Sequence, residues 1–346
     1  MTIDRSAIKH NLQRAREFAP GCRVMAVIKA NAYGHGILQV AEQLSDADMF
    51  AVAMSEEAYA LRADGCDKAI IVLHGFSNER ELRKFSELGL STVIHQQAQL
   101  QQLLDIELED PVDCWLKIDT GMHRLGIDPG IAHSCLEQLN SCSNVKDVFM
   151  MTHFANAEQL NNNLNIKQID EFVKVKNNFL CQRSMANSAA IMRLPASHFD
   201  VIRPGIMLYG SSPFTDITAT ELGLEPAMQF ESVLIDIKTV AAGESIGYGS
   251  LYTCQQDKTV GIVAAGYGDG YPRHAANGPP VWINGASCDL LGRVSMDSLC
   301  IDLSDIEAEI GDRVVLWGKE LSVDLVARSS DTISYELLCA AGACVR

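Results

Sequence analysis

Lys29 is the residue best suited to covalent chemistry, and it opens the segment KANAYGHG (residues 29–36). The apolar run at residues 24–28 is typical of a short buried strand. A lysine in a partly desolvated pocket loses its proton readily and can then attack a carbonyl carbon. The glycines that follow leave room for a ligand to approach the backbone. Taken alone, however, a lysine at a strand end more often extends its ammonium group into solvent.

Further polar and basic residues recur over the next 180 positions, each in a short motif. The motifs WLKIDTGMHRLG, MTHFAN, ANSAA and IRPGIMLYG contain, in this order, Lys117 and Arg124, His153, Ser188, and Arg203 with Gly205 and Ile206. Singly, such residues have ordinary structural roles as a helix cap, an interior histidine or a salt-bridge partner. Their shared position at the ends of predicted strands is harder to explain by chance.

Three motifs near the end of the chain combine glycine with tyrosine or with acidic residues. They are SIGYGSLYT with Tyr248, GYGDGY with Tyr267, and GRVSMD with Met296 and Asp297. GYGDGY does not indicate a dinucleotide loop, because its spacing is GxGxG and Pro272 prevents a following helix. A tyrosine between glycines is usually a turn residue, but an exposed phenol can also act as an acid or base.

The elements that must position these residues fall into two regions. Over residues 1–222, short apolar strands alternate with amphipathic helical patterns, which predicts a parallel sheet. We expect eight strands, at residues 23–29, 49–53, 69–74, 91–95, 113–119, 147–154, 183–187 and 198–203. Eight strands close naturally into a (β/α)8 TIM-type barrel, whose active site lies at the carboxyl ends of the strands. An open doubly wound sheet is the alternative.

The remaining residues, 223–346, predict a smaller and mainly β C-terminal domain. Its expected strands lie at residues 230–242, 259–265, 280–283, 289–291, 298–303 and 313–317. The fold class is therefore α/β, with a barrel followed by a β-domain.

Composition narrows the classes of function. The 346 residues are 47% apolar, so a large core can form, and the net charge of −16 argues against nucleic acid or an anionic membrane as a partner. No stretch reaches the ~18 apolar residues of a membrane span, and the N-terminus lacks the apolar core of a signal peptide. Eleven cysteines without a CxxC pair predict reduced thiols, and no histidine has a partner at metal-ligand spacing. We expect a cytoplasmic protein that binds no metal.

The ordered set of motifs resembles the alanine racemase family, whose enzymes use pyridoxal 5′-phosphate (PLP) and combine a barrel with a β-domain. The resemblance extends from about Ile3 to Arg346. It is carried by AVIKANAYGHG, LKIDTGMHRLG, THFANAE, ANSAA, RPGIMLYG, IGYGSLYT, GYGDGY and GRVSMD. It implies a racemase that interconverts L- and D-alanine and supplies D-alanine for peptidoglycan.

The resemblance also implies a role for each matched residue. Lys29 binds PLP covalently and is the base for the D-enantiomer, while Tyr248 of the partner subunit in a homodimer serves the L-enantiomer. The phosphate is held by Tyr33, Ser188, Gly205, Ile206 and Tyr335. Arg203 bonds the ring nitrogen, and Arg124 contacts the phenolic oxygen and the substrate carboxylate. Lys117 corresponds to a carbamylated lysine that positions Arg124, and His153 orients Tyr248. Met296 binds the substrate carboxylate through its amide, and Tyr267 and Asp297 line the substrate access path.

Other functions on this architecture stay open. An amino-acid decarboxylase would need an acidic residue where Arg203 stands. Because a guanidinium cannot accept a proton, Arg203 leaves the ring nitrogen neutral, which favours racemisation. A PLP-binding regulatory protein without turnover would not need the C-terminal domain. A racemase of broader or different specificity, for example for serine, differs in one substrate hydroxyl, and a pocket discriminates against that only modestly.

Overall fold

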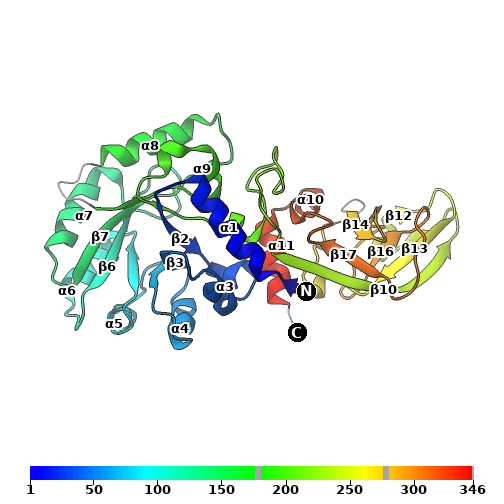
Figure 1. Cartoon of the computed structure of the whole chain (residues 1–346), viewed down its shortest axis with the longest axis horizontal. Coiled ribbons are helices and arrows are strands. Elements are labelled where there is room, and N and C mark those ends of the chain that lie inside the picture. The colour runs from blue at the N-terminus through cyan, green and yellow to red at the C-terminus, as the bar shows by residue number, and fades with distance from the viewer. Residues whose placement is uncertain (176–180, 276–279, 345–346) are drawn as a thin grey trace. The chain divides into compact units, whose positions relative to one another are not determined.

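The computed structural model describes residues 1–175, 181–275 and 280–344 (Figure 1). The chain divides into two compact units. The barrel unit consists of Lys9–Ala32 and Ile37–Leu208. The β unit consists of Met1–Ile8, Tyr33–Gly36 and the residues from Tyr209 onward. The β unit therefore contains segments that are distant in sequence.

The barrel unit contains a closed barrel of eight parallel strands, as the alternating pattern predicts. The strands are β2 (Arg23–Val27), β3 (Met49–Val52), β4 (Ala69–Val72), β5 (Ser91–Ile94), β6 (Val112–Lys117), β7 (Val145–Met151), β8 (Arg183–Ser184) and β9 (Val201–Ile202). β2 closes the ring by pairing with β9, through Arg23 with Val201 and Val24 with Ile202. The central residues of β2 are fully buried, as expected where side chains pack on both faces of a parallel sheet.

Helices surround these strands (Figure 1). They are α3 (Ile37–Gln43), α4 (Ser55–Ala63), α5 (Glu79–Glu87), α6 (Gln97–Asp105), α7 (Pro129–Ser141), α8 (Asn163–Lys174) and the short α9 (Ser188–Arg193). Helix α5 illustrates why such a segment is helical. Asn78 caps its first turn by accepting a hydrogen bond from Glu81 N. Leu82 and Phe85, about one turn apart, are buried on one face.

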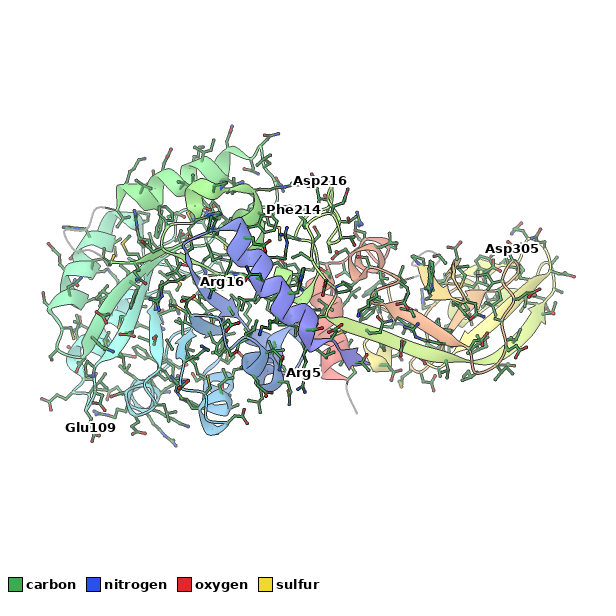
Figure 2. The ribbon with its side chains drawn as sticks, viewed as in Figure 1. Arg5, Arg16, Glu109, Phe214, Asp216 and Asp305 are labelled. Atoms are coloured by element: carbon green, nitrogen blue, oxygen red, sulfur yellow. The ribbon has the colours of Figure 1, made fainter. Side chains whose placement is uncertain are left out.

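Arg16, a basic side chain near the end of helix α1 (Arg5–Phe18), is labelled in Figure 2 and links the helix to other parts of the barrel unit. Arg16 Nη2 lies 3.1 Å from Asp48 Oδ2 and 2.5 Å from the carbonyl oxygen of Asp46. Asp48 Oδ2 also accepts a hydrogen bond from Val24 N at 2.8 Å. One carboxylate thus links α1 to the first residues of β2.

The β unit is built on an antiparallel sheet around the long strand β10 (Met228–Val240). The strand order is β15 (Ala286–Asp289), β14 (Pro280–Ile283), β17 (Arg313–Trp317), β10, β13 (Lys258–Val263) and β16 (Leu299–Asp302). A separate pair joins β11 (Ser245–Ile246) to β12 (Tyr252–Thr253). Helices α10 (Val323–Ser329) and α11 (Ser334–Ala343) follow the last strand. The mainly β character predicted for this region is confirmed.

Two features differ from the sequence-based expectation. The predicted barrel strands extend one to three residues too far at their carboxyl ends. In addition, β1 (Thr2–Ile3) pairs with Gln229 and Met228 of β10, a contact between distant segments that local patterns cannot predict. Among the described residues, no helix is long and apolar enough to cross a membrane.

Candidate active site

Lys29 lies in an unusual backbone turn after β2. The strand ends at Val27, and the four residues Ala30–Tyr33 have φ between 52° and 55°, in the left-handed region. For L-residues this region costs roughly 1–2 kcal/mol each, and such strain is typical of functional sites. The sequence predicted that the strand would continue to Lys29.

Two polar residues that the sequence analysis did not single out stabilise this turn. Asn31 N donates to Glu57 Oε1 at 3.1 Å, and Asn31 Oδ1 accepts from Ile37 N at 2.8 Å. Glu57 Oε2 also accepts from Ala53 N at 3.0 Å, after β3. Asn31, three residues before Gly34, is the sequence signal for this turn, since asparagine tolerates left-handed φ values.

Lys117, the last residue of β6, lies among basic side chains of the barrel unit. Burial, together with the positive charges of Arg203, Arg124 and Lys29, lowers the pKa of Lys117 to about 8. Within the described residues Lys117 makes no ion pair. Asp119 instead accepts hydrogen bonds inside its own loop, from Gly121 N and His123 N. The barrel unit therefore concentrates positive charge around Lys117.

Arg203 follows β9 and is only 5% exposed. Nη1 donates to Ser184 Oγ at 2.7 Å, and Nη2 donates to the carbonyl oxygens of Thr152 at 2.5 Å and Met185 at 3.2 Å. Burial lowers the pKa of Arg203 to about 10, so the guanidinium keeps its charge at neutral pH. With a contact to His153, the Nη atoms make all four hydrogen bonds of Arg203, and Nε has no partner among the described residues.

His153 follows β7 and contacts the same guanidinium. Its Nδ1 lies 3.2 Å from Arg203 Nη2. Burial, followed by the charges of Arg203 and Lys117, holds the pKa of His153 well below its ordinary value. Because Arg203 can only donate, neutral His153 accepts at Nδ1 and carries its proton on Nε2.

Ser188, the first residue of α9, meets the loop that follows β9. Its Oγ accepts hydrogen bonds from Gly205 N at 3.0 Å and Met207 N at 3.4 Å, and Ser188 is 4% exposed. Asn187 caps the helix by accepting from Ala190 N. The hydroxyl proton of Ser188 is therefore available to an anionic group. The residues predicted after the seventh and eighth barrel strands do come together.

Tyr33 and Tyr335 belong to the β unit, where their ring centroids are 5.9 Å apart. Tyr33 also stacks on Tyr209, with the ring centroids 4.8 Å apart. Burial raises the pKa of Tyr33, so the phenol stays protonated and can donate a hydrogen bond. The next residue, Gly34, packs against the backbone of α11: a Cβ there would lie 2.2 Å from the Leu338 carbonyl oxygen.

The other candidates of the β unit lie on neighbouring loops. Tyr267 N donates to Ser295 O at 3.0 Å, and Gly268 N donates to Met296 O at 2.7 Å, so GYGDGY and SMD form one surface. Tyr248 lies between Gly247 (φ 75°) and Gly249 (φ 76°) in the short η3 turn (Tyr248–Ser250). The side chains of Tyr248 and Met296 are 66% and 61% exposed.

Sequence comparison decides the family. The family profiles "Alanine racemase, N-terminal domain" and "Alanine racemase, C-terminal domain" match residues 3–213 and 227–346. The chain belongs to the alanine racemase family. The alanine racemase of Vibrio parahaemolyticus is 46% identical over 338 residues, covering 97% of this chain and 94% of that protein. The biosynthetic alanine racemase of Escherichia coli is 44% identical, with the same coverage.

Solved structures agree with this assignment. The crystal structure of biosynthetic alanine racemase from Pseudomonas aeruginosa has a TM-score of 0.96 and 46% identity, covering 98% of this chain and 96% of that chain. Alanine racemase from Acinetobacter baumannii has a TM-score of 0.93 and 37% identity, covering 98% of this chain and 95% of its own. Both the barrel and the β-domain are therefore those of the family.

Alanine racemases are PLP-dependent amino-acid racemases. The barrel unit fits this anionic cofactor in its charge and donors. Lys29, Lys117, Arg124 and Arg203 all lower the pKa of His153, which shows that their positive charges act on one place. Arg124 has no hydrogen bond or ion pair within the part of the chain that the structure describes. Such a concentration of cations is unfavourable unless an anionic group neutralises it.

Proposed function

We propose that this protein interconverts L-alanine and D-alanine, using two bases on opposite faces of the substrate. The observation that carries the proposal is the buried contact between Arg203 and His153 within the same cationic cluster as Lys29. When bound, PLP supplies the electron sink that makes the Cα proton of an amino acid removable. Everything else in the reaction falls to residues of this chain.

Binding of the cofactor is assigned first. We assign covalent attachment to Lys29, and the phosphate to Ser188, Gly205 and Ile206, with Tyr33 and Tyr335 added by the family relationship. The hydroxyl of Ser188 and the protonated phenol of Tyr33 are both suited to donate to phosphate oxygens. Arg203 Nε is the donor that we assign to the ring nitrogen. Because it cannot accept a proton, it does not favour a protonated ring.

Two residues move the proton at Cα. Lys29 is assigned to the face that gives D-alanine, and Tyr248 of the partner subunit to the face that gives L-alanine. An ordinary lysine or tyrosine has a pKa near 10, so each must be helped to lose its proton near neutral pH. Nearby positive charges favour the neutral form of a lysine, and Lys29 belongs to a cluster of such charges. The Nε2–H of His153 can donate to a tyrosine oxygen and stabilise the phenolate.

Lys117 and Arg124 are assigned to the substrate carboxylate and the phenolic oxygen. Two cations in one partly buried place repel each other, whereas a carbamate on Lys117 would attract Arg124. The lowered pKa of Lys117 supports this, because carbon dioxide reacts with the neutral amine and releases a proton. The alternative, a structural pair between Lys117 and Asp119, is less well supported, since Asp119 bonds its own loop.

A homodimer with shared sites completes the proposal. Tyr248 and Met296 are mostly exposed on their own subunit, and a catalytic phenol needs a desolvated setting. We therefore assign Tyr248 and the Met296 amide to the partner subunit's site, with Tyr267 and Asp297 along the access path. We also propose a cytoplasmic role in supplying D-alanine for peptidoglycan, which the family relationship supports.

The test is the reaction itself. Purified protein with PLP should convert L-alanine to D-alanine and the reverse, measured by chiral chromatography, with L-serine turned over more slowly. Borohydride reduction should fix the cofactor to a single peptide containing Lys29, identified by mass spectrometry, and Lys29→Ala should lose this label. A label on another lysine would contradict the assignment of Lys29. Faster turnover of serine, or loss of carbon dioxide, would replace the proposed reaction.

A further inference from the structure

Helix α8 turns two amide side chains toward the interior of the barrel unit. Asn165, Gln168 and Phe172 lie on one helix face, at spacings of three and four residues, and are 1%, 0% and 0% exposed. A buried amide costs free energy unless its donors and acceptors are bonded. The partners of each amide therefore show which part of the barrel it holds.

Gln168 bonds the turn that carries His153. Its Oε1 accepts a hydrogen bond from Ala155 N at 3.0 Å, and its Nε2 donates to the His153 carbonyl oxygen at 2.9 Å. An N–H can only donate and a carbonyl can only accept, so these two partners fix the orientation of the amide. The two bonds hold both sides of Phe154. Gln168 thus clamps the backbone on which the His153 side chain stands.

A third bond connects Gln168 to the loop after β6. Nε2 lies 3.3 Å from Thr120 Oγ1, which lies 2.8 Å from Thr152 Oγ1. The Thr152 carbonyl in turn accepts from Arg203 Nη2. Next to Thr120, Gly121 leaves room for helix α8, since a Cβ there would lie only 3.2 Å from Leu164 Cδ1. Gln168 is therefore bonded directly to the backbone of His153 and is linked to Arg203 through Thr120 and Thr152.

We propose that Gln168 is a positioning residue that sets the place of the His153 Nε2–H donor. The inference rests on the proposed function, in which this donor assists Tyr248 on the L-face. Glutamate at position 168 would keep the bond from Ala155 but place a carboxylate oxygen against the His153 carbonyl oxygen. The turn must then move, and a displacement near 1 Å at a catalytic group can cost about 10²-fold in rate.

The experiment compares exchange of the Cα proton with deuterated solvent in L-alanine and in D-alanine, followed by NMR at early times. Gln168→Glu should slow exchange into L-alanine about 10- to 100-fold, and into D-alanine less than about 3-fold. Gln168→Met, which is neutral and similar in length, should shift the ratio in the same direction. Gln168→Met provides the test if the buried carboxylate of Gln168→Glu prevents folding.

Asn165→Asp is the matched control. Asn165 Nδ2 donates to the carbonyl oxygens of Asn156 and Gln159, both at 3.0 Å, and does not bond His153. The control makes the same amide-to-acid change on the same buried helix face, so it should leave the ratio of the two exchange rates unchanged. An unchanged ratio in active Gln168 variants overturns this inference alone. A wild-type protein that exchanges neither enantiomer overturns the proposed function as well.

Discussion

His153 Nδ1 lies 3.2 Å from Arg203 Nη2, and this contact decides where the imidazole carries its proton. A histidine that accepts a hydrogen bond at one ring nitrogen and donates one from the other is held in a single tautomer. The same residue, read in the sequence motif MTHFAN, could equally have been an interior histidine with satisfied bonds. The distinction depends on a partner 50 positions away, which no local pattern contains.

Tyr248→Phe tests the two-base proposal at a single atom. The variant should retain exchange of deuterium into D-alanine, because Lys29 remains, while exchange into L-alanine falls about 10²- to 10⁴-fold. Initial exchange rates measured by NMR for each enantiomer give the answer. Equal losses for both enantiomers would contradict two bases and indicate one base that serves both faces.

Lys117→Ala tests the carbamate. The variant should lose activity and regain part of it when a small carboxylate such as acetate is added, because the carboxylate can replace the missing anion beside Arg124. Racemisation rates with increasing acetate, against the same concentrations of chloride, measure the rescue. Absence of rescue, together with an unmodified Lys117 in electron density, would count against carbamylation.

The lowered pKa of Lys117 has a consequence for stability in buffer free of carbon dioxide. Between pH 8 and 10.5 the unfolded chain binds the Lys117 proton and the folded chain does not. The free energy of unfolding should therefore rise with pH across this window, by about 1–2 kcal/mol from pH 8 to 9.5. Urea denaturation at fixed protein concentration should show this rise in wild type. Lys117→Met, treated identically, should lack it; equal slopes would mean that Lys117 is not held among cations.

At the scale of elements, Gly34 and helix α11 form a tight contact within the β unit. Gly34 has φ of 83°, and a Cβ at Gly342 would lie 2.1 Å from Gly34 Cα. Neither position has space for a methyl group, so the two backbones touch directly. This contact places Tyr33 beside Tyr335, whose rings lie 5.9 Å apart.

Gly34→Ala should therefore destabilise the protein and weaken PLP retention. Backbone strain and overpacking each cost about 1 kcal/mol or more, so we expect a loss of roughly 3 kcal/mol in total. Gly21→Ala is the matched control, because Gly21 has φ of 82° but nothing within 4 Å of its added Cβ. It should cost only about 1 kcal/mol. Chemical denaturation and PLP titration of the apoprotein measure both effects, and equal losses would show that packing against α11 contributes nothing.

The order and number of the barrel strands could be predicted because most of them are buried apolar runs between amphipathic helices. The turns at their ends could not. Ala30–Tyr33 takes a left-handed conformation that depends on Glu57 of another element. The role of Gln168 could not be predicted for a different reason. In an amphipathic helix, the sequence does not distinguish a buried glutamine from one that faces solvent. Only its partners, His153 and Ala155, reveal its role.

At the scale of the whole molecule, Lys29 and Tyr248 belong to different units of the chain. The proposal that they meet across a dimer can be tested by mixing Lys29→Ala with Tyr248→Phe, each inactive alone. After subunit exchange, a mixed dimer with shared sites has one site with both lesions and one site with none. Activity should approach roughly a quarter of wild type for random pairing. Continued inactivity in confirmed mixed dimers would falsify shared sites.

The β unit also takes in residues from the very start of the chain, and this affects the order of events during synthesis. β1 cannot pair until β10 has been synthesised. Gln229 of β10, the partner of Thr2, lies 227 positions after it in the chain. At about 5–20 residues per second, the ribosome takes roughly 10–45 s to add them. The eight barrel strands all lie between residues 23 and 202, so the barrel can close on the nascent chain first. The β unit is then completed last, when β10 pairs with a strand that left the ribosome before the barrel strands.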